Sequence, residues 1–240
     1  MYSAYQVLGK FYDRLIEYPY QFALSLATQK HKSGKALDLF CGTGRFSMLL
    51  AEQGFTVEAS DLSGEMLQEG MTNASKRMLK ILFKKENALE FAFSSPFDVI
   101  TATSDGINYL TDEELKSFFP RVYSALIEGG RFVFDMSTTY KLTEILGNEL
   151  YYEDLEDLTY FWQNTLRKKD NSVKMELTFF EKNSQGLYIR SDECQRQYSH
   201  TLEYILEISR QCGFKIINVL DEKNRAPKAK SERIFFILEK

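Results

Sequence analysis

A short apolar run that ends in a glycine turn is the feature that most constrains the fold of this chain. Residues 36–45 read ALDLFCGTGR, which joins the pattern of a buried strand to the pattern of a helix start. Because Gly42 and Gly44 lack a Cβ atom, they let the backbone turn tightly and approach a ligand, and the following helix offers unpaired N–H groups. This order of strand, turn and helix is typical of an open α/β sheet.

Two acids indicate what such a turn would bind. Asp38 precedes the first glycine by four residues, and Asp61 closes the next apolar run about twenty residues further on. A dinucleotide site keeps its helix start free for pyrophosphate, whereas an acid at Asp38 suits a ligand with an amine. The position of Asp61 is usual for a carboxylate that binds ribose hydroxyls. We therefore expect a ligand with an amino acid at one end and a ribose at the other.

These residues resemble the class I S-adenosylmethionine-dependent methyltransferases, whose first motif is similar to LDLFCGTG at 37–44. The later motifs of that family resemble DLSGEML at 61–67, NALEF at 87–91 and FDVI at 97–100 with the loop to 110, and FYD at 11–13 matches its opening. The likeness covers most of the chain. It implies S-adenosylmethionine as the cofactor and methyl transfer as the activity.

The resemblance also implies which residues bind the cofactor. In that family the glycine turn holds the methionine part, the acid of the second motif holds the ribose, and the third motif reads adenine. Two departures are Phe40, where many members have glycine, and Asn87, where aspartate is usual; an amide oxygen can still accept from the adenine amino group. The implied set is Asp38, Phe40, Cys41, Gly42, Thr43, Gly44, Asp61, Leu62, Met66, Asn87, Ala88 and Thr103.

Strand and helix patterns alternate along the chain as a parallel sheet requires. Strands are predicted at 35–40, 56–60, 81–85, 98–103 and 131–135, with helices after Gly44, after Ser63, after the capping box that begins at Thr111, and at 201–212. The apolar face of the helix that begins after Thr111 is expected to include Leu126. Closing strands at 215–220 and 233–239 are joined without a helix, so they pair antiparallel. We predict a three-layer, doubly wound, mostly parallel seven-stranded sheet.

The pattern changes to period two between residues 136 and 200, which predicts an inserted antiparallel sheet. We therefore divide the chain into a cofactor-binding domain, 1–135 with 201–240, and an insertion, 136–200. An insertion after the fifth strand leaves from the ligand-binding edge, so it is placed to cover the site. Its aromatic side chains either line an acceptor pocket or pack on the domain; they are Tyr160, Trp162, Phe180, Tyr188 and Tyr198.

Tyr12 and Asn108 are the candidate catalytic residues. Tyr12 lies on an amphipathic N-terminal helix that in related small-molecule methyltransferases folds over the cofactor, and the alternative is a core ring, as for Tyr5. Asn108 follows the fourth strand near the switch point of the sheet, and its alternative role is turn formation. Weaker candidates with ordinary structural alternatives are Asp105, His200, His31 and Arg190.

Composition narrows the partners. The formal net charge of −4 argues against a nucleic acid partner, so we expect a small-molecule acceptor, with the chain a monomer or homodimer. The three cysteines have no metal-ligand spacing, which indicates no metal and a reducing compartment. Because no apolar run or leader pattern suits a membrane or secretion, we expect no membrane contact and a cytoplasmic protein.

Two other functions stay open at this point. A nicotinamide-dependent reductase, using NAD or NADP, would also use Gly42, Gly44 and Asp61, although Ser47 occupies its third glycine position. A non-catalytic module that binds S-adenosylmethionine would carry the same motifs as an enzyme. Binding of NADH would favour the first, and binding without turnover the second.

Overall fold

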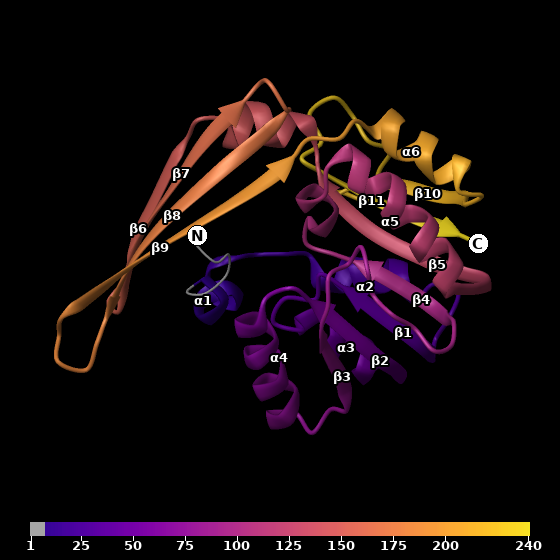
Figure 1. Cartoon of the computed structure of the whole chain (residues 1–240), viewed down its shortest axis with the longest axis horizontal. Coiled ribbons are helices and arrows are strands. Elements are labelled where there is room, and N and C mark those ends of the chain that lie inside the picture. Colours follow the sequence, from indigo (N-terminus) through magenta and orange to yellow (C-terminus); the bar gives the residue numbers. More distant parts are fainter. Residues whose placement is uncertain (1–7) are drawn as a thin grey trace.

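The computed structural model describes residues 8–240, which form two β-sheets with helices packed around the larger one (Figure 1). The larger sheet has seven strands in the order β10-β11-β5-β4-β1-β2-β3. Its parallel strands are β1 (Gly34–Leu39), β2 (Phe55–Asp61), β3 (Ile81–Lys85), β4 (Phe97–Ala102) and β5 (Leu126–Ser137). The closing hairpin of β10 (Lys215–Asp221) and β11 (Arg233–Glu239) is antiparallel, with β11 against β5. The predicted fold class is confirmed.

Helices cover both faces of this sheet. A cluster of buried side chains packs under α2 (Tyr20–Ala27) and α3 (Arg45–Glu52), and a second cluster packs under α5 (Asp112–Ala125) and α6 (Leu202–Gln211). The helix α4 (Gly64–Lys76) lies against β2 and β3. We did not predict α2, although its apolar residues have helical spacing. Among residues 8–240, no helix is both long enough and apolar enough to cross a membrane.

The predicted helix starts are present. The Ser63 hydroxyl accepts from the Met66 backbone N–H at the start of α4, and Thr111 and Glu114 form the capping box of α5. One boundary was wrong: α5 ends at Ala125, and Leu126 begins β5 instead of completing the helix face. The fifth strand is thus longer than predicted, and its last residues reach the edge of the sheet where the insertion leaves.

The insertion contains the second sheet, an antiparallel sheet in the order β6-β7-β8-β9. It follows a π-helical turn, η2 (Lys141–Leu146), and comprises β6 (Leu150–Asp154), β7 (Leu158–Arg167), β8 (Ser172–Lys182) and β9 (Tyr188–Tyr198). The predicted alternation is confirmed, because Val173, Met175, Leu177 and Phe179 are all buried on one face. All four strands fall within 136–200. The division of the chain into a cofactor-binding domain and an insertion stays a prediction.

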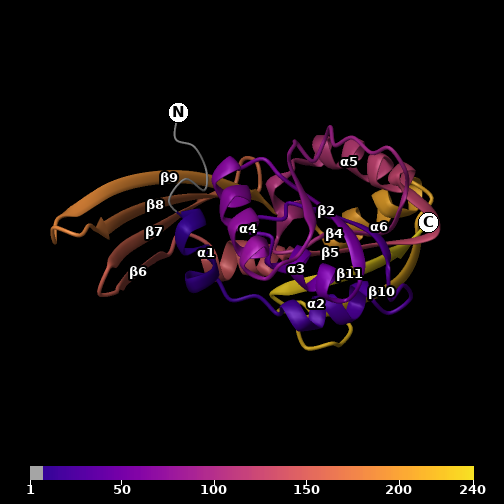
Figure 2. The same ribbon diagram turned by 90° about the horizontal axis from the view of Figure 1, so that it is seen from below.

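The first helix, α1 (Leu8–Leu15), lies between this second sheet and α4 (Figure 2). Leu8 belongs to the buried cluster of the insertion, and its backbone N–H donates to Glu193 on β9. At the other end of the helix, Asp13 accepts from the Thr43 hydroxyl in the glycine turn. The helix therefore connects the insertion to the turn after β1. Tyr5 lies outside the described residues.

Candidate active site

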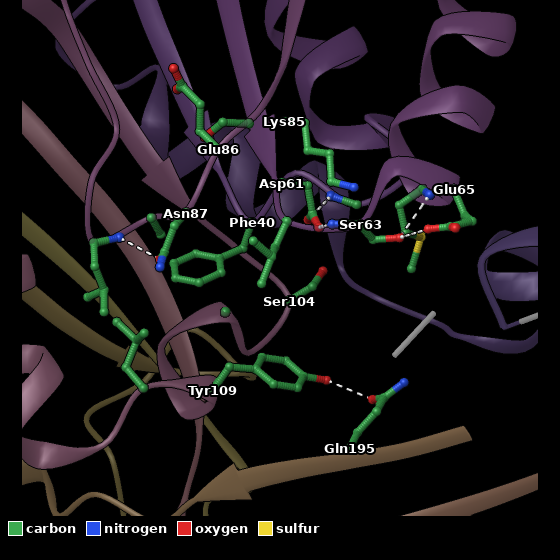
Figure 3. A pocket seen from close by; sticks show the side chains of 18 of the residues that line it. Phe40, Asp61, Ser63, Glu65, Lys85, Glu86, Asn87, Ser104, Tyr109 and Gln195 are labelled. Atoms are coloured by element: carbon green, nitrogen blue, oxygen red, sulfur yellow. Dashed lines mark hydrogen bonds between the residues drawn. The ribbon is translucent and has the colours of Figure 1, made fainter. Parts of the chain in front are cut away.

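A cavity of about 520 Å³ lies at the edge of the main sheet where β1, β2, β3 and β4 end (Figure 3). Its walls come from the main domain, from α1 and from β9 of the insertion. The size is within the usual range for a small-ligand site. Eight of the predicted site residues line it: Tyr12, Phe40, Gly42, Asp61, Leu62, Met66, Asn87 and Ala88.

The turn after β1 brings its backbone to the cavity through left-handed residues. Phe40, Gly42 and Gly44 all have positive φ, at 55°, 53° and 70°. A Cβ on Gly44 would lie 2.8 Å from the Phe83 ring, whereas one on Gly42 would meet only the Met66 sulfur, at 3.9 Å. Gly44 is therefore required by packing as well as by φ, and Gly42 keeps the cavity wall open.

Phe40 adopts the left-handed conformation in spite of its side chain, which costs about 1–2 kcal/mol for an L-residue. This explains why the related family prefers glycine there. The ring packs at 5.9 Å from that of Phe118 and fits over Gly106, where an added Cβ would lie 2.8 Å from the Phe40 ring. Phe40 is thus a wall of the cavity as well as a turn residue.

Asp61 fixes the geometry of two loops. Its carboxylate accepts from the Gly42 backbone N–H and from the Ser63 backbone N–H, each at 2.9 Å. Burial raises the pKa of this group, and the two backbone hydrogen bonds oppose that shift. A carboxylate offers about four lone-pair positions, so further positions remain for ligand hydroxyls. The ribose role predicted for Asp61 fits this arrangement and stays a prediction.

The hydroxyl of Ser60, beside Asp61, supports a polar ligand at this wall. It is buried, lines the cavity and has no hydrogen-bond partner among the described residues. Buried polar groups are rarely left without a partner, so a bound polar molecule would complete this site. The Ser60 hydroxyl and the Asp61 carboxylate together suit the hydroxyl-bearing part of a nucleoside.

Asn87 lines the side of the cavity where adenine is predicted to bind. Its amide oxygen accepts from the Leu89 backbone N–H at 3.0 Å, which forms a tight turn after β3. An amide oxygen has two lone pairs, so one remains available for an amino group. The asparagine therefore keeps a hydrogen-bond acceptor on this side of the cavity, and its role in binding adenine stays a prediction.

Asp38 does not line the cavity, and its assignment to a ligand amine stays a prediction. Its carboxylate is fully buried behind the turn, where it accepts from the Ser47 hydroxyl at 2.6 Å and the Thr101 hydroxyl at 2.7 Å. Asp38 therefore joins β1, α3 and β4. Cys41, Thr43, Gly44 and Thr103 also lie outside the lining, so their contribution is to the shape of the turn and strand ends.

We expect Asp38→Asn to change how stability depends on pH. Burial raises the pKa of Asp38 to about 6, so the folded protein binds a proton more tightly than the unfolded chain. The contribution of Asp38 to stability should then fall by about 2 kcal/mol as pH rises from 4 to 7, through the raised pKa, and the asparagine variant should lack this loss. Urea unfolding of both proteins at pH 4, 5, 6 and 7 measures it. Parallel curves for the two proteins would contradict this account.

Asn108 does not line the cavity, and no contact in the described part of the chain supports its assignment as catalytic. It is fully buried in the short 3-10 turn η1 (Gly106–Tyr109). Its amide oxygen accepts from the Ser137 backbone N–H, and its amide nitrogen donates to the carbonyl oxygens of Ser137 and Tyr198. These bonds use its polar atoms to fasten the turn to β5 and the insertion. Asn108 is therefore a structural residue.

The weaker candidates also have structural partners. Asp105 pairs with Arg233 and does not itself line the cavity, and Arg190 lies on the surface beside Asp192. The His200 ring is buried, where Nε2 donates to the Leu110 carbonyl oxygen and Nδ1 lies 2.8 Å from Asp112 Oδ1. His31 is only partly exposed, with Nε2 3.1 Å from the Gly129 carbonyl oxygen.

The insertion contributes to the cavity through residues that we did not predict. Cys194, Gln195 and Arg196 of β9 line it, and the Tyr109 hydroxyl of η1 donates to the Gln195 amide oxygen at 3.1 Å. None of the five aromatic residues suggested for an acceptor pocket lines it. Tyr160 and Trp162 pack against the core of the insertion instead. The alternation of β9 gave no signal, because its buried face carries polar residues, Glu193, Gln195 and Gln197.

Comparisons with known proteins agree with this geometry. A family model described as a methyltransferase domain matches residues 36–130. A putative methyltransferase from Geobacillus sp. (strain WCH70) is 33% identical over 245 residues, which cover 98% of this chain and 99% of the relative. Another, from Bacillus subtilis (strain 168), is 33% identical over 241 residues, covering 98% and 97%.

Solved structures show the same likeness. An S-adenosylmethionine-dependent methyltransferase from Clostridium acetobutylicum ATCC 824 aligns with a TM-score of 0.85 and 27% identity, covering 97% of this chain and 96% of that one. A sugar N-methyltransferase from Streptoalloteichus sp. ATCC 53650 aligns with a TM-score of 0.74 over 100% of this chain and 94% of its own, and at 14% identity it shows a shared fold.

Proposed function

The chain belongs to the S-adenosylmethionine-dependent methyltransferases, and from this premise we propose that it transfers the methyl group to an oxygen, nitrogen or carbon atom of a small molecule. The observation that carries the proposal is a cavity whose walls combine the cofactor motifs with β9 of the insertion. Family membership sets aside the nicotinamide-dependent reductase.

The arrangement of the walls supports a small acceptor. On one side lie the cofactor motifs, including Asp61 and Asn87, and on the other lie Tyr109 and Gln195 (Figure 3). Tyr12 of α1 also lines the cavity, and α1 is held between the insertion and α4. An acceptor between these walls would be largely surrounded by protein. The formal net charge of −4 further favours a small molecule over a nucleic acid.

Alignment of the reactants is the main task of the protein in this proposal. S-adenosylmethionine supplies a methyl group on a positively charged sulfur, which is a good leaving group. Holding an acceptor in line with that bond lowers the activation barrier by up to about 7–11 kcal/mol. Burial raises the pKa of Tyr12 well above its ordinary value, so its hydroxyl stays neutral and acts as a hydrogen-bonding group rather than a base. The acceptor atom would then bring its own lone pair, as an unprotonated amine or ionised oxygen does.

Ligand-induced stabilisation tests the cofactor site. We expect S-adenosylmethionine and its demethylated product, S-adenosylhomocysteine, at about 100 times Kd to raise the melting temperature by roughly 5–10 °C. NADH at the same concentration serves as the control and should leave it unchanged. Transfer of labelled methyl groups to a panel of small amines, alcohols and carbon acids then identifies the acceptor. Absence of a shift with both S-adenosyl ligands would contradict the proposal.

A further inference from the structure

Gln195 presents a hydrogen-bond donor that the described protein does not use. The side chain is 5% exposed and lines the cavity, and its amide oxygen accepts from the Tyr109 hydroxyl. The amide nitrogen, Nε2, has no hydrogen-bond partner among residues 8–240. Burying a donor without a partner costs free energy, so such groups are rare in native proteins and call for an explanation.

The bond from Tyr109 orients this amide. Tyr109 reaches Gln195 from η1 of the main domain, whereas Gln195 comes from β9 of the insertion. Figure 3 shows the amide nitrogen on the side of the group that faces away from Tyr109. Because Tyr109 holds the oxygen, the two N–H groups of Nε2 are the polar groups of this side chain that remain without a partner in the described part of the chain.

The position of Gln195 points to the acceptor rather than to the cofactor. The family motifs that bind the cofactor place Gly42, Asp61 and Asn87 on other walls of the cavity, on the turns after β1, β2 and β3. Gln195 belongs to the insertion and lies outside those motifs. The Ser60 hydroxyl, another buried polar group without a partner among the described residues, is beside Asp61 and so belongs to the cofactor wall.

We propose that Gln195 Nε2 donates a hydrogen bond to an oxygen atom of the methyl acceptor, so that the substrate is a small molecule with a hydroxyl, carbonyl or carboxylate oxygen near the methylated atom. This inference rests on the proposed methyl transfer. An N–H group can only donate, so its partner on the substrate must carry a lone pair. A site built to bind such an oxygen discriminates strongly against analogues that lack it, because the buried donor is then left unpaired.

Matched fragments test this inference without knowledge of the natural acceptor. The probes are pairs of small ring amines that differ by one oxygen, such as 2-aminocyclohexanol with cyclohexylamine and tetrahydropyran-4-amine with cyclohexylamine. Their affinities for the complex with S-adenosylhomocysteine are measured by NMR, and crystals of that complex are soaked with each. We expect the oxygen-bearing member to bind at least about tenfold more tightly, with its oxygen within hydrogen-bond distance of Nε2.

Two variants make the test specific. Gln195→Leu should abolish the difference within each pair. Because it removes the unpaired donor and also the acceptor of the Tyr109 hydroxyl, its melting temperature is measured to show that the variant folds. Gln197→Leu is the matched control, since Gln197 is also buried on β9 but does not line the cavity. It should keep the discrimination. Gln195→Met provides a second, flexible replacement if the leucine variant does not fold.

The outcomes separate this inference from the proposed function. The inference is overturned if no oxygen-bearing fragment reaches Nε2, if both members of each pair bind equally, or if the Gln195 variants keep the discrimination. If the wild-type protein does not bind S-adenosylhomocysteine, the proposed function itself fails. Binding of S-adenosylhomocysteine without discrimination between fragments overturns the role of Gln195 alone.

Discussion

Replacing Arg233 by methionine should destabilise the protein by about 3–5 kcal/mol, the usual effect of removing one partner from a buried ion pair. Arg233 on β11 donates to both carboxylate oxygens of Asp105, at 2.6 and 3.0 Å, and also pairs with Asp135. Methionine replaces the aliphatic part of the arginine side chain but leaves two carboxylates buried without a cation. Chemical unfolding in urea measures the loss.

The pH dependence of this loss is a further expected result. In the wild type, burial favours the neutral form of Asp105, but the Arg233 charge outweighs that effect and lowers the pKa of Asp105. Burial raises the pKa of Asp135, with the Arg233 charge opposing it and the Asp105 charge adding to it. Without Arg233 both carboxyls should hold their protons to higher pH. The variant should therefore lose more stability at pH 8 than at pH 5.

A surface arginine provides the control. Arg190→Met removes an exposed pair with Asp192 and should cost less than about 1 kcal/mol. If Arg233→Met costs no more than this control, or the same at both pH values, the buried cluster does not stabilise the fold as described. The cluster also affects the cavity, because Asp135 accepts from the backbone N–H groups of Ser104 and Asp105, and Ser104 lines the cavity.

Replacing Asp61 by alanine should weaken S-adenosylhomocysteine binding by about 100-fold. Hydrogen bonds to a charged group contribute about 1.5–3 kcal/mol each, and the carboxylate would lose its bonds to ligand hydroxyls. It would also lose the bonds from the Gly42 and Ser63 N–H groups that position both loops. Isothermal titration calorimetry of wild type and variant measures the change.

Glu58→Ala is the matched control for Asp61→Ala. Glu58 lies on the same strand, β2, but pairs with Lys84 and does not line the cavity. This variant should bind S-adenosylhomocysteine within about twofold of the wild type. An Asp61→Ala protein that also binds within twofold would show that Asp61 has no role in holding the cofactor.

Local patterns in the sequence were sufficient for the main sheet, its closing hairpin and the turn after β1. Strand periodicity and caps act on neighbouring residues, so Ser63 and the capping box at Thr111 could be recognised without the fold. The departure at Phe40 was visible too, and the structure adds its cause, a left-handed backbone that favours glycine. The helix α2 had a readable stripe of apolar residues that we did not use.

The roles of individual polar residues depended on the tertiary structure. Asp38 and Asn108 have the residue types and strand-end positions of ligand-binding groups, yet both are satisfied by distant parts of the chain. No sequence pattern identified Gln195 as a site residue. Its proposed role follows only from its position beside Tyr109 and in the cavity wall.

The sequence by itself determined the family, the succession of strands and helices along the chain and the loops that line the cavity, because these follow from short-range periodicity and from the few residues that tolerate a left-handed turn. The tertiary structure alone decided which polar groups are free for a ligand and which are already paired. A hydrogen bond between residues far apart in the chain leaves no local trace in the sequence, as the pair of Arg233 and Asp105 illustrates.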